Sequence, residues 1–291
     1  MKKDKTSVLI HIIFILFAIA CIVPFMMIVS ASLTSVEDLS LHGFSVLPPK
    51  VDLSAYAYLF ENPGQIINAY IVTIFITVIG TFLAVLFMSM AAYALARPNF
   101  RFKKIATAYI FFPTLFSGGM VASYITYTQY LHLTDSIWVM ILPGLCNVYH
   151  LFMIRTFFKQ LPEGLFDAAQ VDGAGEWRIY FTIALRLSKP VIATVAFLGA
   201  LGRWNTWYAA QLYIRSESKY PLQYLLQRIM MNIRELLNAM EHVPTMVTSA
   251  ELPTENLRMA LLVVCIGPMM MFFPFFQKYF TKGMTVGAVK G

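Results

Sequence analysis

The chain has 291 residues, of which 58% are hydrophobic and only 13% are charged. Soluble domains carry roughly 25% charged residues, so these proportions exclude an ordinary soluble protein and place much of the apolar surface against lipid. The net charge of +7 is interpreted as loop charge rather than as affinity for nucleic acid, because Lys and Arg accumulate on the cytoplasmic side of membrane proteins.

The N-terminal segment has some features of a signal peptide, because Lys2, Lys3 and Lys5 precede an apolar stretch. A signal core has only ~7–15 apolar residues, whereas this run continues past Cys21. Residues 7–32 are long enough to cross a bilayer, which takes ~20 residues. We therefore expect a retained membrane-spanning helix at the N-terminus.

Six segments of the chain are long and apolar enough to cross a bilayer. Helices satisfy their own backbone hydrogen bonds inside lipid, and the alternating pattern of a membrane barrel is absent from the sequence. We predict an all-α integral membrane protein whose single transmembrane domain covers residues 1–291. The predicted spans are residues 7–32, 66–96, 105–130, 137–158, 190–214 and 257–280.

The spans contain two features that we interpret as packing. Cys21, Cys146 and Cys265 each lie in an apolar run, so we interpret them as small buried hydrophobic residues and expect neither a metal site nor a disulfide. Gly118 and Gly119 are adjacent in the third span, where they permit close helix contact or a bend.

The basic residues define the orientation of the spans. Fifteen of the 22 basic residues lie on one side of the predicted membrane, and the more positive side is cytoplasmic. Both termini are therefore predicted to be cytoplasmic. These fifteen residues are Lys2, Lys3, Lys5, Arg97, Arg101, Lys103, Lys104, Arg155, Lys159, Arg178, Arg186, Lys189, Lys278, Lys282 and Lys290.

Two loops on the opposite side are substantial. Residues 34–65 are rich in proline and glycine and are predicted to be irregular. The second extracytoplasmic loop covers residues 215–256, and Leu and Ile recur at helical spacing over 222–237. This pattern predicts an amphipathic helix outside the membrane, which either lies on the lipid surface or offers a platform to an external partner protein.

The cytoplasmic loop over residues 159–189 has too ordered a pattern for a slack linker. Pro162 suits the first turn of a helix, and the acidic Glu163 near that end favours the helix dipole. Gly173 is placed to end this helix, because glycine accepts the left-handed conformation at a C-terminus. A second helix is predicted over about 177–187, so two short helices protrude into the cytoplasm.

The first of these helices has the composition of a docking surface. Ala168 and Ala169 are small and permit close approach by another protein. Phe166 is predicted to be an apolar anchor of the kind that dominates interfaces.

Three separated stretches of sequence carry a family resemblance. The cytoplasmic loop reads DAAQVDGAGEW over 167–177, the second outer loop reads YPLQ over 220–223, and the C-terminus reads QKYFTKGMTVGAVKG over 277–291. Together they resemble ABC importer permeases of the MalG-like oligosaccharide branch, and the first stretch resembles the EAA loop of that family. Two positions depart from the usual motif, because Asp167 replaces its opening Glu and Arg186 replaces a common Pro.

The resemblance implies a type I importer permease in a bacterial cytoplasmic membrane. It implies a subunit without catalytic activity or a bound cofactor. Its implied partners are membrane lipid, a second permease, an extracytoplasmic sugar-binding protein and an ATPase dimer that uses ATP and Mg. In the family, the EAA helix docks into a cleft of the ATPase and transmits its closure. We carry this coupling role to Glu163, Phe166, Asp167, Ala168, Ala169, Asp172 and Gly173.

The fifth predicted span carries a charge, Arg203, ~13 residues from its start and therefore near mid-depth. A charge at this depth usually faces protein or water. In similar permeases this part of the helix lines the cavity, where aromatic faces stack on sugar rings and polar groups bond hydroxyls. The predicted substrate-path residues are Arg203, Trp204, Asn205, Trp207 and Tyr208.

These path residues leave alternatives open. Trp207 and Tyr208 also fit an interfacial aromatic belt. Arg203 also suits a bond to the partner permease or to a backbone carbonyl. A positive group over a wet cavity additionally suits an acidic sugar such as a uronate.

Other classes of membrane protein fit the sequence less well. A secondary transporter would need internal repeats and buried acidic residues, and the predicted spans contain no Asp or Glu. A membrane enzyme would need a convergent set of His, Ser or carboxylate groups in the spans, and none is recognised. An importer for amino acids, peptides or phosphonates is disfavoured by the second and third matching stretches. The sequence has no phosphate-binding loop of the GxxxxGK[ST] type, so ATP hydrolysis is expected from another chain.

Overall fold

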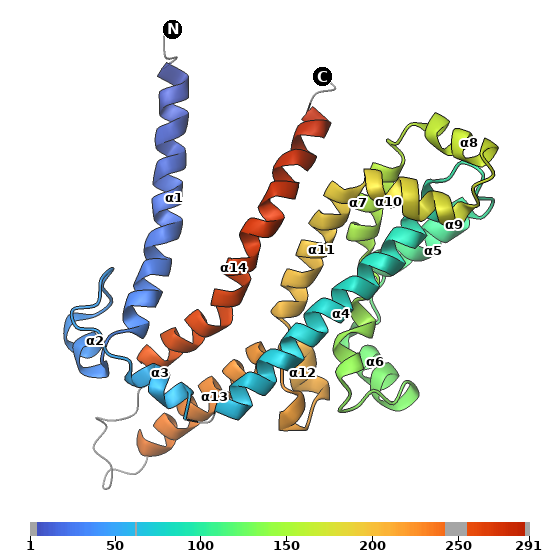
Figure 1. Cartoon of the computed structure of the whole chain (residues 1–291). Coiled ribbons are helices and arrows are strands. Elements are labelled where there is room, and N and C mark those ends of the chain that lie inside the picture. Colours follow the sequence, from blue (N-terminus) through green and yellow to red (C-terminus); the bar gives the residue numbers. More distant parts are fainter. Residues whose placement is uncertain (1–4, 62, 242–254, 289–291) are drawn as a thin grey trace. The chain divides into compact units, whose positions relative to one another are not determined.

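The computed structural model describes residues 5–61, 63–241 and 255–288, which are shown in Figure 1. These residues form helices, with short 3-10 and π-helical turns and no strand among them. The predicted all-α class is confirmed. The chain divides into two compact units, one comprising residues 1–66 and 226–270 and the other residues 67–225 and 271–291.

The helices differ widely in length, from one turn to 34 residues. The α-helices are α1 Lys5–Ser32, α2 Val36–His42, α3 Ser54–Leu59, α4 Pro63–Ala96, α5 Lys103–Leu115, α6 Gly119–Ile125, α7 Val148–Phe158, α8 Glu163–Val171, α9 Glu176–Ile179, α10 Leu185–Leu187, α11 Lys189–Trp204, α12 Tyr208–Tyr213, α13 Leu222–Glu241 and α14 Glu255–Ala288. The 3-10 and π-helical turns are η1 Thr126–Tyr130, η2 Ile137–Met140, η3 Leu142–Gly144, η4 Tyr180–Ala184 and η5 Glu217–Lys219.

Three of these helices are individually long and apolar enough to cross a membrane, namely α1, α4 and the first part of α14. Three bent helix pairs bring the number of possible spans to six. The bends are 115° between α5 and α6, 45° between η3 and α7, and 82° between α10 and α11. Broken helices are tolerated at membrane depth where protein or water satisfies the freed backbone groups.

The bend in the third span occurs at its glycine pair. α5 ends at Leu115 and α6 begins at Gly119, whose φ of +79° is readily accessible to glycine. Of the two roles predicted for Gly118 and Gly119, the bend is the one observed.

The prediction of one continuous helix over residues 190–214 is wrong. α11 ends at Trp204 and α12 begins at Tyr208, so a break separates them. The Asn205 side chain donates to the Leu201 carbonyl at 2.9 Å, and the Thr206 backbone N–H bonds to Arg203 rather than continuing the helical pattern. Asn and Thr compete in this way with regular helix bonds, so the helix ends at the residues predicted to line the substrate path.

The prediction of an irregular loop over residues 34–65 is also wrong, because α2 and α3 lie there. The Ser35 side chain accepts a hydrogen bond from the Asp38 backbone N–H at 3.1 Å and thereby caps α2. Gly43, with φ of +70°, ends the helix. Local capping at Ser35 and Gly43 therefore makes part of this proline-containing loop helical.

The larger unit contains two hydrophobic clusters, and α4 contributes to both. Among the described residues, this single helix therefore connects the two clusters. The inner cluster comprises Ala84, Met88, Ala92, Tyr93, Leu95, Leu151, Ile154, Phe158, Phe166, Ile179, Tyr180, Ala184, Val191 and Val195. The outer cluster comprises Val72, Ile76, Val139, Met140, Ile141, Ala210, Tyr213, Ile214 and Tyr220.

The three cysteines differ in exposure. Cys265 is buried as predicted, whereas Cys21 and Cys146 are exposed, so the prediction is wrong for these two. An apolar run does not bury each of its residues in a membrane protein, because the lipid-facing side of a span stays exposed on the protein itself.

Candidate functional site

The predicted coupling helix is α8, which begins at Glu163 directly after Pro162 and ends at Val171. Gly173 has a φ of +77°, so the predicted left-handed glycine at the end of this helix is confirmed. The second predicted helix starts at Glu176 and continues through a π-helical turn to Leu187. Figure 1 shows α8 beside α9 and the neighbouring end of α4.

Phe166 lies inside the protein rather than on a docking surface. Its side chain is 5% exposed and packs in the inner cluster. Its ring centroid lies 6.4 Å from that of Tyr93, and the Arg97 guanidinium carbon lies 4.9 Å from the Phe166 ring centroid. The interpretation of Phe166 as an anchor for a partner is therefore wrong, because this side chain attaches α8 to α4 of its own chain.

A carboxylate completes this attachment. Tyr93 donates to Oε2 of Glu176 at 2.6 Å, and Arg97 pairs with Oε1 at 3.1 Å. Gln170 of α8 donates to the same Oε1 at 3.0 Å. Glu176 begins α9, so this carboxylate links α8, α9 and the cytoplasmic end of α4. This role of Glu176 was not predictable from the sequence, because Tyr93 and Arg97 lie 83 and 79 residues away from it along the chain.

The remaining coupling candidates divide by exposure. Glu163, Asp167, Ala168, Asp172 and Gly173 are exposed and form an acidic, small-residue surface. Ala169 is partly buried against the inner cluster.

Two apolar residues of α8 are exposed as well. Val171 is 88% exposed and Leu165 is 44% exposed. Their signal in the sequence is weak, because a helix with Leu165, Phe166, Ala169 and Val171 does not reveal which apolar side chain faces the core.

Arg203 is held by backbone carbonyls. Its Nη2 donates to the Gly144 carbonyl at 2.6 Å, and its Nη1 donates to the Gly199 carbonyl at 3.2 Å. One of the alternatives raised for this charge, a bond to a backbone carbonyl, is therefore observed. These contacts join α11 to the break between η3 and α7.

Three glycines leave room for the Arg203 side chain. A β-carbon added at Gly80 would lie 2.6 Å from Nε of Arg203, closer than real β-carbons approach. Added β-carbons at Gly199 and Gly144 would lie 3.2 and 3.4 Å from its guanidinium nitrogens. Because these glycines come from α11, α4 and η3, Arg203 lies where three segments of the larger unit converge.

The other predicted path residues have different surroundings. Trp204 is 5% exposed, and its ring lies 6.5 Å from that of Tyr70. Asn205 is exposed. Trp207 and Tyr208 are 41% and 48% exposed, with ring centroids 5.6 Å apart. The two rings beside the helix break are therefore exposed on the chain, whereas the Trp204 ring is buried.

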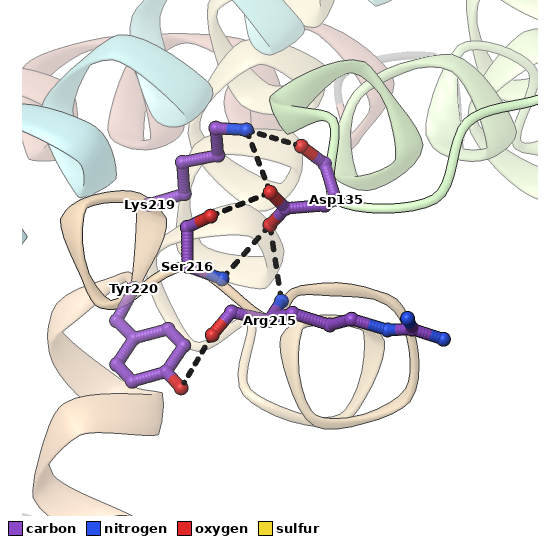
Figure 2. Close-up of polar contacts among 5 residues, drawn as sticks. All are labelled: Asp135, Arg215, Ser216, Lys219 and Tyr220. Atoms are coloured by element: carbon purple, nitrogen blue, oxygen red, sulfur yellow. Dashed lines mark hydrogen bonds and ion pairs between the residues drawn. The ribbon is translucent and has the colours of Figure 1, made fainter.

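On the extracytoplasmic side, Asp135 holds the start of the second outer loop, as Figure 2 shows. Its carboxylate accepts from the Arg215 and Ser216 backbone N–H groups at 3.0 Å each and from the Ser216 hydroxyl at 2.6 Å. Lys219 pairs with it at 2.9 Å. Hydrogen bonds from the Ser216 side chain and backbone and from Lys219 hold the pKa of Asp135 well below its ordinary value, against the opposing effect of burial.

The extracytoplasmic part of α4 also contacts this loop. The Thr73 hydroxyl accepts from the Leu222 backbone N–H at 2.8 Å, at the first residue of α13. The Asn68 amide donates to the Ser218 carbonyl at 2.6 Å. The amphipathic helix predicted from sequence is confirmed as α13, and its start is fixed to α4.

Comparison with known proteins identifies the family. Residues 53–286 match the family described as "Binding-protein-dependent transport system inner membrane component". The chain belongs to this family. This permease is thus a multi-pass inner-membrane component of an ABC importer, and family membership implies that it acts with another permease and an ATPase.

Individual relatives agree over nearly the whole chain. The permease is 34% identical to the polygalacturonan/rhamnogalacturonan transport system permease protein YtcP of Bacillus subtilis, with 100% of both chains covered. It is 38% identical to Protein LplC of the same species over 93% of this chain and 90% of that protein.

A solved structure has the same fold. A bacterial ABC transporter involved in the import of the acidic polysaccharide alginate matches with a TM-score of 0.82 and 27% identity, covering 96% of this chain and 98% of that chain. The resemblance to MalG-like permeases and the type I importer permease fold are confirmed.

Proposed function

We propose that this permease imports carbohydrates, and specifically oligosaccharides that contain uronic acid units. One similar protein is named as a permease for polygalacturonan/rhamnogalacturonan transport, and another is described as involved in the import of the acidic polysaccharide alginate. Arabinooligosaccharides are named for a more distant relative. The first two of these named substrates are acidic polymers, so they support a negatively charged sugar as the substrate of this permease.

Arg203 supports the same substrate class. Its observed hydrogen bonds go to carbonyls, which do not neutralise its charge, and the predicted spans contain no carboxylate. A guanidinium has five N–H donors, so two engaged donors leave capacity for a sugar carboxylate. Trp207 and Tyr208 beside the helix break offer exposed rings on which a sugar stacks.

The single observation that carries the coupling mechanism is the set of contacts along α4. This helix has 34 residues and is therefore ~51 Å long. Its cytoplasmic end bonds to Glu176 of the coupling loop, its middle passes Arg203 at Gly80, and its outer part bonds to the start of α13. We infer that α4 transmits movement of α8 to the substrate path and to the outer surface.

The exposed surface of α8 is the part that meets the ATPase in this mechanism. Glu163, Asp167 and Asp172 offer charge, while Ala168 leaves room for close approach. Phe166, Ala169 and Gly173 act by positioning that surface on the chain. ATP and Mg are used by the ATPase dimer, a second permease completes the path, and an extracytoplasmic binding protein delivers the sugar.

The coupling proposal is tested with the importer purified together with its partners and reconstituted in proteoliposomes. Ala168→Arg places a bulky charge on the exposed surface of α8 and should release the ATPase or uncouple hydrolysis from uptake. Thr182→Arg is the matched control, because Thr182 is also exposed in the cytoplasmic loop but lies outside α8. Normal assembly and transport with Ala168→Arg would contradict the role of α8.

The substrate proposal has a separate readout. ATPase stimulation in the same proteoliposomes is measured with oligogalacturonate and with a neutral glucose oligosaccharide of equal length, each with the cognate binding protein. Stimulation by the acidic sugar alone supports the proposal. Stimulation by the neutral sugar alone contradicts it while leaving the coupling mechanism standing.

A further inference from the structure

A groove lies between α5 and α7, away from Arg203 and from α8. It has a volume of about 690 Å³ and is open along its length. Its lining combines three basic side chains with an apolar floor. Lys103, Lys104 and Arg155 supply the charges, and Ala108, Phe111 and Phe152 supply the apolar surface.

The basic residues gather at the cytoplasmic end of this basic groove. Lys103 and Lys104 begin α5, and Arg155 lies in the last turn of α7. Lys103 donates to the Arg97 carbonyl at 3.3 Å, and Arg155 donates to the Leu95 carbonyl at 3.4 Å. These bonds hold two of the cations where α4 ends.

Among the residues that the structure describes, the basic side chains of the groove form no ion pair with a carboxylate. In the part of the chain that the structure describes, the ion pairs found involve other basic residues than Lys103, Lys104 and Arg155. Arg155 and Lys159 are instead close enough to repel the charge of Lys103. A bound anion would relieve this repulsion.

The apolar floor begins within one turn of the charges. Lys104, Ala108 and Phe111 follow at helical spacing along one face of α5. The Phe111 and Phe152 rings meet edge to face with centroids 6.3 Å apart, and the Arg155 guanidinium carbon lies 5.4 Å from the Phe152 ring centroid. The groove thus changes from cationic to apolar over ~10 Å, two helical turns.

We propose that the basic groove binds one anionic phospholipid of the cytoplasmic leaflet. Its phosphate lies among Lys103, Lys104 and Arg155, and an acyl chain lies along Ala108, Phe111 and Phe152. Basic pockets between membrane-spanning helices on the cytoplasmic side suit anionic head groups. A free phosphate would match the charges but would leave the apolar floor uncovered, so the amphiphile is the better fit.

The test uses the assembled importer in nanodiscs that contain a photoactivatable phosphatidylglycerol. Crosslinked peptides are mapped by mass spectrometry, and labelling is expected at residues 103–111 or 152–155. The double variant K103Q/K104Q should reduce this labelling roughly fivefold for each charge removed. The matched control R178Q/R186Q removes the same charge from exposed cytoplasmic positions outside the groove and should leave the labelling unchanged.

A second variant tests the apolar half of the groove. Ala108→Trp fills the floor, keeps every charge and should abolish the labelling. Equal labelling by a photoactivatable phosphatidylcholine would overturn the proposal, because charge would then not select the lipid. Crosslinking to the partner permease instead of lipid would overturn it too, as would loss of labelling on addition of inorganic phosphate at constant ionic strength.

Discussion

The Arg203 side chain passes directly over Gly80, so closely that a β-carbon at this position would lie 2.6 Å from Nε of Arg203. Gly80 lies on α4 and Arg203 lies on α11. The Arg203 guanidinium continues past this contact to the Gly144 carbonyl at 2.6 Å. The long helix α4, which reaches both sides of the membrane, thereby contacts Arg203, the charged residue proposed to meet the substrate.

Gly80→Ala is expected to displace Arg203 from the Gly144 carbonyl. Overpacking of this kind costs about 1–3 kcal/mol, so the thermal stability of the purified permease should fall and uptake should fall with it. Gly202→Ala is the matched control, because Gly202 is also a helical glycine, on α11, but a β-carbon there would have no neighbour within 4 Å. Equal effects of the two substitutions would show that the Gly80 contact is not specific.

The same contact predicts energetic coupling between the two residues. Once Arg203→Met has removed the guanidinium, Gly80→Ala should cost little additional stability, because the group that it displaces is gone. A double-mutant cycle on thermal unfolding measures this interaction, which contacting residues show at about 0.5–3 kcal/mol. Additive effects would contradict the geometry.

Arg203→Met is expected to impair acidic substrates more than neutral ones. The substitution keeps similar length and removes the charge, whereas Arg203→Lys keeps a charge but loses the planar fork. Uptake of oligogalacturonate and of a neutral oligosaccharide by each variant provides the comparison. If both sugars lose uptake equally, the charge preference is wrong while a path role remains; if the folded variant transports normally, Arg203 is only structural.

Substitutions on α8 should separate attachment from docking. Phe166→Ala removes a side chain that is 5% exposed and should destabilise the permease by about 3–5 kcal/mol, because it leaves a cavity beside Tyr93. Leu165→Ala and Val171→Ala change exposed side chains, so the melting temperature should stay constant while the copurifying ATPase is reduced. An unchanged melting temperature for Phe166→Ala would be incompatible with its packing.

Asp135→Asn is expected to loosen the start of the second outer loop. Because the pKa of Asp135 is lowered in the folded protein, its charge adds stability above the ordinary carboxyl pKa of about 3.9. That contribution is lost as the pH falls from this value through the lowered pKa. The variant should therefore be less stable by about 1 kcal/mol at pH 7, and the difference should narrow below about pH 4.

The choice of substitution matters at this position. Asp135 has a φ of +55°, which Asn tolerates better than most residues. Asp135→Asn therefore isolates the charge, whereas Asp135→Ala adds backbone strain. Thermal unfolding measured from pH 7 to pH 3 checks the prediction, and a constant difference over this range would exclude the charge as its cause.

A cysteine at Gln227 on α13 should crosslink to the extracytoplasmic binding protein. Gln227 is exposed, whereas Gln223 is partly buried and donates to Asn205 at 3.4 Å, so Gln227 is the better probe. A cysteine at Leu41 on α2, which is 79% exposed, serves as the control on another outer segment. Capture of lipid alone at position 227 would instead support the alternative that α13 lies on the membrane surface.

Local signals explain why much of the coupling loop was predictable. Pro162 and Gly173 fix the ends of α8 through backbone preferences that act within a few residues. The role of Phe166 was not predictable in the same way, because an apolar residue on a short helix packs equally well inside or outside. Only its placement against Tyr93 and Arg97 decides that it faces the core.

The substrate path likewise has one feature that the sequence predicted and others that it did not. Sequence placed one charge deep in the fifth span, which is unusual enough to indicate function. It did not reveal that Asn205 ends the helix there, nor that glycines 59 and 123 residues away from Arg203 in the chain make room for its side chain.

The membrane class, the helical content and the orientation follow from the sequence alone, because hydropathy and the positions of Lys and Arg act segment by segment. Family membership followed from short motifs in the same way. The tertiary structure alone decided which residues cooperate, including Glu176 with Tyr93, Gly80 with Arg203, and Asp135 with Lys219. These pairs are joined by packing between distant segments, and no local preference of the chain encodes such a contact.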